Sequence, residues 1–255
     1  MNGNLSEASS EPRRPVRLAV ASYNIHGCVG TDRLYRPYRT AEVIREIDAQ
    51  VVGLQEVDSR LQGGGGMNQL EFLAMITGFR SLSGPCIQDD KGCFGNALLT
   101  NLPVLSFQTI DLSLSGREPR GIIDAHLEMN GAEIRILNTH LGRGGRERRF
   151  QVNRLKQAIE EETGKLTIIL GDFNEWFPRS RCSRMLTACF GRKLHRPTYP
   201  SLFPILSLDR IWVLPENVKT VVQVHSSPLA QVTSDHLPIR AEIEWEMKEI
   251  ASGQR

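Results

Sequence analysis

The chain lacks the features that place a protein in a membrane or in the secretory pathway. No apolar run approaches the roughly 18 residues that a membrane-spanning helix needs. Residues 1–15 are polar and charged and contain no apolar stretch of the kind found in a signal peptide. The sequence therefore predicts no stable membrane anchor, and we expect a cytoplasmic protein.

Paired cysteines and an excess of one charge are missing as well. The five cysteines are an odd set with no CxxC pair, which argues against a structural zinc site and favours reduced thiols. The formal net charge is only +2, so overall electrostatics gives no indication of a nucleic-acid binder. These absences leave an ordinary globular protein, and its function has to be read from local motifs.

The length of 255 residues fits one large domain. We predict a single catalytic domain over residues 16–246, preceded by a disordered tail over 1–15 and followed by a second tail over 247–255. The glycine-rich segment 62–66 has no Lys-Ser/Thr ending, so we interpret it as a flexible linker instead of a phosphate-binding loop.

Hydrophobic periodicity predicts an alternation of strands and helices with a hairpin in the centre. Asn130-Gly131 is a strong two-residue hairpin signal between two strands. Helical spacing covers residues 40–47, 70–76, 146–162 and 183–190, and strands are expected over 16–23, 51–54, 96–100, 104–110, 121–129, 133–138, 166–170, 205–214, 218–224 and 239–245. Two mixed β-sheets packed face to face, with helices outside, account best for this order.

Six short segments place polar side chains at the ends of apolar strands. They are residues 22–27, 54–58, 138–142, 171–174, 208–211 and 234–238. Each supplies groups that bind metal or move a proton, and we expect these strand ends to meet. Such a set suits metal-assisted attack of water on a phosphate ester.

Single residues in these segments support that chemistry. Glu56 follows a buried run, where a carboxylate is costly unless it is paired or bound to metal. Asp172 follows Gly171, which allows close approach of backbone and substrate. His236 lies beside Asp235, so the carboxylate can face a metal while the imidazole faces phosphate.

With these motifs, the sequence resembles the endonuclease/exonuclease/phosphatase superfamily, of the deoxyribonuclease I-like type, and most of all its small bacterial members. The resemblance runs from about residue 16 to about residue 245, and segments 171–174 and 234–238 are its most specific parts. It implies a four-layer α/β sandwich and a magnesium-dependent phosphoesterase in which Mn²⁺ is a possible substitute. The metal would be held by Asn24, Glu56 and Asp235.

The resemblance also implies the catalytic roles. Asp172 would orient or deprotonate the attacking water; His140, Asn174 and His236 would stabilise phosphoryl charge; and Asp209 would fix the tautomer of His236. The alternative for Asp209 is a salt bridge to Arg210. His26 stands where some family nucleases have a second acidic residue, which leaves open whether one or two metals bind.

Substrate contacts are less defined by the sequence. Arg143 belongs to an arginine cluster that is either a phosphate-binding lip or the solvated face of a helix, with Glu147 as an ion-pair partner. Arg120 precedes a strand and is expected to reach the cleft. The apolar loop 199–204 is expected to be packed, with contact to a lipid or a base as the alternative.

A phosphodiester is the preferred substrate, either nucleic acid or a phospholipid head group. A soluble inositol or sugar phosphate monoester is the alternative, and a catalytically silent binding module is a third possibility. No protein partner can be inferred.

Overall fold

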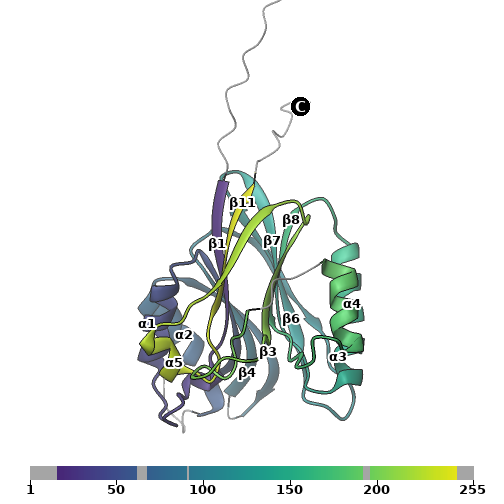
Figure 1. Cartoon of the computed structure of the whole chain (residues 1–255). Helices are drawn as coiled ribbons and strands as arrows, with labels where there is room; N and C mark the ends of the chain where they lie inside the picture. The colour runs from purple at the N-terminus through teal and green to yellow at the C-terminus, as the bar shows by residue number, and fades with distance from the viewer. Residues whose placement is uncertain (1–15, 62–67, 91, 192–195, 246–255) are drawn as a thin grey trace, which may run out of the picture.

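Two β-sheets pack face to face in the computed structural model, which describes residues 16–61, 68–90, 92–191 and 196–245 (Figure 1). The first sheet has six strands in the order β10-β11-β1-β2-β4-β3, and the second has five in the order β5-β6-β7-β8-β9. Both sheets are mixed, because β1 runs parallel to β2 and β7 parallel to β8 while the other neighbours are antiparallel.

The strands have the following bounds. The six-stranded sheet contains β1 (Val16–Asn24), β2 (Val51–Asp58), β3 (Arg80–Asp89), β4 (Gly92–Thr100), β10 (Lys219–Val224) and β11 (Ile239–Trp245). The five-stranded sheet contains β5 (Val104–Asp111), β6 (Gly121–Met129), β7 (Ala132–His140), β8 (Leu166–Asp172) and β9 (Asp209–Leu214). β1, β2 and β8 are buried along almost their whole length because both faces of these central strands are covered.

Helices cover the outer face of each sheet. Figure 1 shows α1 (Pro37–Ile47), α2 (Gln69–Thr77) and α5 (Pro228–Thr233) on one side, and α3 (Gly145–Glu160) and α4 (Arg181–Phe190) on the other. Local capping sets several of these ends: the Asn68 and Ser180 side chains accept from the first turns of α2 and α4, and Pro37 opens α1.

Three apolar clusters lie between the four layers. One joins α1, α2 and α5 to the six-stranded sheet, one fills the space between the sheets, and one joins α3 and α4 to the five-stranded sheet. This arrangement confirms the expected four-layer α/β sandwich. None of the described helices is long and apolar enough to cross a membrane.

Most predicted elements are present with shifted ends, and the Asn130-Gly131 hairpin is confirmed, with both residues at positive φ. The sequence reading missed β3 and α5. β3 carries Ser, Gly, Pro and Cys with little apolar alternation, and α5 is a short helix announced only by Ser227 and Pro228. The strand expected over 205–214 begins only at Asp209, since residues 205–208 belong to the preceding loop.

Both tails and segment 62–66 lie outside the described residues. All five cysteines are among the described residues, and all are free thiols.

Candidate active site

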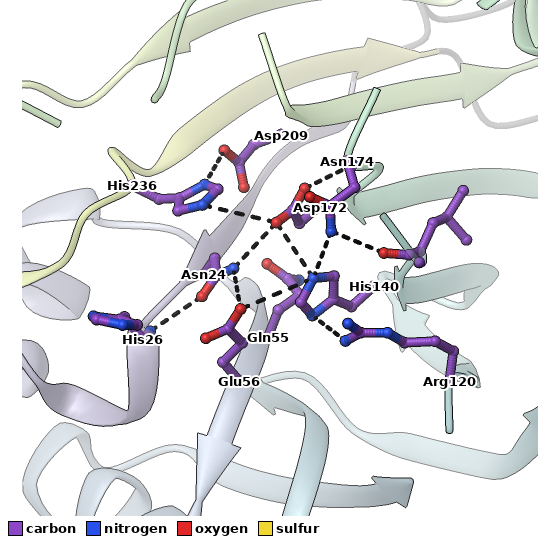
Figure 2. A network of polar contacts seen from close by, with 12 residues as sticks. Asn24, His26, Gln55, Glu56, Arg120, His140, Asp172, Asn174, Asp209 and His236 are labelled. Carbon is purple, nitrogen blue, oxygen red and sulfur yellow. Dashed lines mark hydrogen bonds and ion pairs between the residues drawn. The ribbon is translucent and has the colours of Figure 1, made fainter. Parts of the chain in front are cut away.

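The functional side chains meet at one edge of the sandwich because of the strand directions. β7 and β8 are parallel and end together, so His140 pairs in register with Asp172. β9 is antiparallel to β8 and therefore starts at the same edge, which places Asp209 opposite Asp172. The end of β1 at Asn24 faces them from the other sheet (Figure 2). Residues separated by most of the chain are thus brought within hydrogen-bonding distance.

Gly171 is required by this edge for a reason that differs from the expected one. Its φ is +150°, and a Cβ at this position would lie 1.9 Å from the carbonyl oxygen of Thr139. The close approach is between two backbones of the same sheet, and no substrate is needed to explain it. Gly171 therefore lets β8 deliver Asp172 beside β7.

A β-bulge in β2 aims Glu56 into the site. The register against β4 shifts between Leu54 and Val57, and Glu56 adopts a φ of +57°. A non-glycine residue in this region stores strain, and bulges commonly redirect a side chain near a functional site. The regular alternation of the strand would have sent this carboxylate elsewhere.

Asn24 joins the two sheets at the centre of the network. Its Nδ2 donates to Glu56 Oε1 and to Asp172 Oδ2, both at 3.1 Å, while its Oδ1 accepts from the His26 backbone N–H at 3.1 Å (Figure 2). One amide group thus holds two carboxylates. In this arrangement Asn24 acts as a donor toward the carboxylates, and its oxygen is already engaged.

Asp172 is buried, and its carboxyl group is unusually easy to protonate. Burial raises its pKa, the charge of Asp209 raises it further, and His236 together with hydrogen bonds from Asn174 and Asn24 opposes the rise, giving a pKa of about 6. The Asn174 backbone N–H donates to Oδ1 at 2.8 Å and fixes the carboxylate plane. An oriented carboxylate with this pKa is suited to accept a proton near neutral pH.

His236 and Asp209 form a buried pair. His236 Nδ1 lies 2.8 Å from Asp209 Oδ2, and the Thr198 hydroxyl donates to the same oxygen at 2.5 Å. Burial lowers the pKa of His236, but the charge and hydrogen bond of Asp209, together with the charges of Asp172 and Asp235, raise it to about 10. His236 is therefore a cation at neutral pH, and its Nε2 lies 3.8 Å from Asp172 Oδ2.

Arg210 does not pair with Asp209, contrary to the alternative interpretation. Its side chain donates instead to the carbonyl groups of Ser207 and Glu175. The orienting hydrogen bond to His236 is the arrangement present in the structure.

His140 has the opposite electrostatic setting. Burial lowers its pKa well below the usual range, and Arg120, His236 and Arg143 lower it further. Arg120 Nη1 lies 3.0 Å from Nδ1 and has only protons to offer, so Nδ1 accepts and neutral His140 carries its proton on Nε2. Asn174 Nδ2 lies 3.0 Å from this Nε2 and donates to the Leu141 carbonyl at 2.9 Å, so of the two neighbours the guanidinium, which carries a full charge, decides the tautomer.

Arg120 therefore lies behind His140 and is almost completely buried. Its other nitrogen, Nη2, is 3.1 Å from Glu118 Oε1. From the sequence, Arg120 was expected to contact the substrate directly. We propose instead that Arg120 positions His140.

The donor set fits a divalent cation. Glu56 and Asp172 share the one amide of Asn24, and their ion-pair partners within the described residues are only histidines. The site thus gathers carboxylate groups that have no ion-paired lysine or arginine among the described residues, as oxygen-ligated Mg²⁺ sites do. Asp172, Asp209 and His236 also place potential ligand atoms within 4.8 Å of one another.

Asp235 lies at the margin of this network. Its side chain is about one-third exposed, and its Oδ1 is 3.9 Å from His26 Nδ1. Its backbone carbonyl accepts from Ser201, which ties the loop before β9 to the segment that carries His236.

The arginine cluster after His140 divides into two groups. Arg148 is buried, and its Nε lies 3.4 Å from Glu175 Oε2. Arg143 is exposed and close enough to His140 to lower the pKa of that imidazole. Glu147 caps α3 by accepting from the Gly144 N–H. The contacts of the described residues contain no ion pair between Glu147 and an arginine of the cluster.

Several supporting residues were missed by the sequence reading. Asn138 donates to the carbonyl groups of Leu54 and Ala97 and accepts from Gln55 Nε2, so it links the two sheets directly under Glu56. Gly53 leaves room for this link, because a Cβ there would meet Asn138 and Leu170. Asn138 stands in the same segment as His140, which is the only signal the sequence offered.

The sequence comparisons agree with this architecture. Residues 21–236 match the model of the Endonuclease/Exonuclease/phosphatase family, and the chain belongs to that family. The uncharacterized protein YbhP of Escherichia coli K12 is 28% identical over 241 residues, covering 88% of this chain and 95% of YbhP.

Solved structures share the fold at lower identity. An endonuclease/exonuclease/phosphatase from Bacteroides vulgatus superposes with a TM-score of 0.75 at 21% identity, covering 91% of this chain and all of that one. A mannosyl-6-phosphatase from Bacteroides thetaiotaomicron superposes with a TM-score of 0.69 at 19% identity, covering 89% and 99%. At these identities the likeness concerns the fold alone.

Proposed function

We propose that this protein is a Mg²⁺-dependent phosphodiester hydrolase. The observation that carries the proposal is one buried network in which Asp172, held by Asn24 and the Asn174 N–H, faces the Asp209-oriented imidazole of His236, with Nε2 3.8 Å from Asp172 Oδ2. At neutral pH this combination supplies a base and a cation side by side.

Asp172 accepts the proton of the attacking water in this mechanism. The water oxygen forms its bond to phosphorus while the bond from phosphorus to the leaving oxygen breaks. Asn24 and the Asn174 N–H hold the Asp172 carboxylate in one orientation, so little reorganisation is needed during the reaction.

Three side chains stabilise the charge that develops on the phosphoryl oxygens. His236 offers an N–H with a full positive charge, maintained by Asp209. His140 offers a neutral Nε2–H, fixed by Arg120, and Asn174 Nδ2, which donates one N–H to the Leu141 carbonyl, offers the other. Arg143, exposed beside His140, is placed to contact a further phosphate or the distal part of the substrate.

Glu56, with Asp235, would hold the metal. Asn24, whose oxygen accepts from the His26 N–H, would position the Glu56 and Asp172 carboxylates in place of the ligand role expected from the sequence. A bound Mg²⁺, or Mn²⁺ in its place, would supply positive charge to the phosphate and lower the pKa of water.

A phosphodiester is preferred to a monoester because one cation, His236, and two neutral donors, His140 and Asn174, surround the reacting position. Beside the charge that the metal would supply to either ester, a dianionic monoester needs more positive charge from the protein itself than these three groups provide. The mannosyl-6-phosphatase from Bacteroides thetaiotaomicron keeps a sugar phosphate monoester as the second candidate.

The test is hydrolysis of bis-p-nitrophenyl phosphate and of p-nitrophenyl phosphate, with Mg²⁺, Mn²⁺ or EDTA. We expect metal-dependent cleavage of the diester, and a loss of at least ~100-fold in kcat for Asp172→Asn and for His236→Ala. Asp48→Asn is the matched control, because Asp48 ends α1 in a left-handed conformation that asparagine also adopts.

Near-full activity of either active-site variant would refute the mechanism. Cleavage of the monoester alone would replace the diesterase by the phosphatase. No turnover of any phosphate ester, with Mg²⁺ still bound, would indicate a silent binding module.

A further inference from the structure

Two apolar loops project from the molecule beside the candidate active site. The first contains Trp176 and Phe177, just after Asn174, and the second contains Leu202, Phe203 and Ile205, just before Asp209. Among the described residues, the three most exposed large apolar side chains are Phe203 at 79%, Ile205 at 75% and Phe177 at 70%. Isolated exposed apolar residues are ordinary, but three such extremes on two neighbouring loops are not.

The loops are joined to each other and to the catalytic residues. The Trp176 and Tyr199 rings lie 6.0 Å apart, and the Tyr199 ring lies 4.9 Å from the imidazole of His236. Ser201 donates from its backbone to the Asp235 carbonyl and from its hydroxyl to the Ser234 carbonyl. The second loop is therefore anchored at its base to the segment of His236, while its tip extends outward.

The composition of these segments indicates a site that binds an extended surface more than a pocket that encloses a small ligand. Residues 199–207 contain no charged residue, whereas residues 176–184 contain Arg179, Arg181 and Arg184 and no acid. All three arginines are exposed. The less exposed rings of Trp176 and Tyr199 lie at the base of the loops and are of the kind that lines a nucleobase site, whereas Phe203 and Ile205, at 79% and 75% exposure, face solvent and line nothing within the protein.

We propose that these loops dock the protein on an anionic phospholipid bilayer. Phe177, Phe203 and Ile205 insert among the head groups, and Arg179, Arg181 and Arg184 contact lipid phosphates. Docking in this way turns the edge that carries His236 toward head-group phosphates. That the hydrolysed ester belongs to a lipid rests on the proposed function, whereas docking itself does not require turnover.

The experiment measures binding of the full chain to vesicles, by co-sedimentation and by the fluorescence of Trp176. Vesicles of phosphatidylcholine with phosphatidylglycerol are compared with phosphatidylcholine alone, in EDTA so that no hydrolysis occurs. We expect binding to the anionic vesicles that weakens with salt, and a blue shift of the emission as Trp176 enters the interface.

Phe203→Ser/Ile205→Ser should weaken this binding at least about tenfold, because the inserted apolar area is lost. Arg179→Gln should weaken it by about fivefold, the effect of one arginine at an anionic surface. Phe107→Ser, which removes a half-exposed ring from the middle of β5, should bind like the wild type. All of these variants should keep the wild-type activity on bis-p-nitrophenyl phosphate.

Equal binding by the double variant and the wild type would overturn the proposal, as would absence of binding to anionic vesicles. Loss of affinity for single-stranded oligothymidine in the double variant, with no vesicle binding, would assign the loops to nucleic acid. Vesicle binding by a protein that hydrolyses nothing would leave the docking surface intact and remove only the proposed enzymatic function.

Discussion

Single residues in this site owe their properties to their neighbours. His140 ends β7 and His236 lies in the segment before β11, yet burial and Arg120 keep the first imidazole neutral while Asp209 keeps the second charged. The division of labour between the two imidazoles is therefore decided by a guanidinium and a carboxylate that lie behind them.

Removing Arg120 should change the pH dependence of the reaction. In Arg120→Met the pKa of His140 rises toward its ordinary value and the Nε2–H tautomer is no longer imposed. We expect the acidic limb of the kcat profile to move to higher pH, with a loss of about 10- to 100-fold in kcat. Side-chain NMR of His140 measures the same titration directly.

Arg120→Gln is the matched comparison, because glutamine keeps a donor near Nδ1 and removes the charge. It should retain more activity than the methionine variant. Unchanged pH profiles in both variants would show that Arg120 does not act through His140.

Asp172 should make the metal-free protein less stable as the pH rises. Its pKa of about 6 lies above the unfolded value of 3.8, so the folded state holds the proton more tightly. Stability from this group is lost between pH 3.8 and about 6 and stays lost at higher pH.

In EDTA, the Tm of Asp172→Asn minus the Tm of the wild type should therefore increase between pH 4 and pH 7. The corresponding change in the difference between their free energies of unfolding is on the order of 2 kcal/mol. Thermal unfolding at a series of pH values measures the difference. A difference in Tm that is independent of pH would contradict the raised pKa.

At the scale of elements, the site depends on how two sheets are held together. Asn138 on β7 satisfies two carbonyl groups of the other sheet and the Gln55 amide, all within the buried layer under Glu56. A bridge of this kind fixes the relative position of the two strand edges, and with it the spacing between Glu56 and Asp172.

Asn138→Leu should cost about 2–4 kcal/mol in the free energy of unfolding, because buried polar groups lose their partners. Urea denaturation measures this loss. Weaker Mg²⁺ binding should accompany it, since the bulge that aims Glu56 loses its support.

Ile136→Val is the control on the same strand, buried in the same layer. It should cost about 1 kcal/mol and leave Mg²⁺ affinity unchanged. If both substitutions changed the Mg²⁺ affinity equally, the hydrogen bonds of Asn138 would have no specific role in positioning Glu56.

For the whole molecule, metal binding and folding should be linked. A divalent cation would relieve the repulsion between the Glu56 and Asp172 carboxylates, so Mg²⁺ at 100 times its Kd should add about 2.7 kcal/mol of stability. For a protein of this size we expect a rise in Tm of about 5–10 °C that EDTA reverses.

Glu56→Gln should abolish most of this rise, whereas the exposed Glu242→Gln should not. The comparison is needed because His126, Glu133 and Glu162 form a second group with metal-binding geometry, next to Lys165. A persistent Mg²⁺ effect in Glu56→Gln would place the ion away from the candidate active site.

Local signals in the sequence were sufficient for much of the architecture. Apolar runs that end in polar residues predicted the central strands, and Asn130-Gly131 predicted the hairpin between β6 and β7. These features depend on side-chain period and on turn chemistry, which act between near neighbours in the chain. β3 and α5 were not predicted because an edge strand and a short helix carry little hydrophobic periodicity and little turn chemistry.

The candidate residues could be named from the sequence because strand ends carry them, but their properties come from contacts between distant segments. The bulge at Glu56, the Asn138 bridge and the guanidinium behind His140 all require the two sheets to be packed. The exposure of Phe203 and Ile205 likewise depends on tertiary structure, since loop 199–204 was expected to be packed. The sequence alone thus determined which groups are available, whereas charge state, orientation and exposure were decided by tertiary structure, because desolvation and electrostatics depend on distance in space.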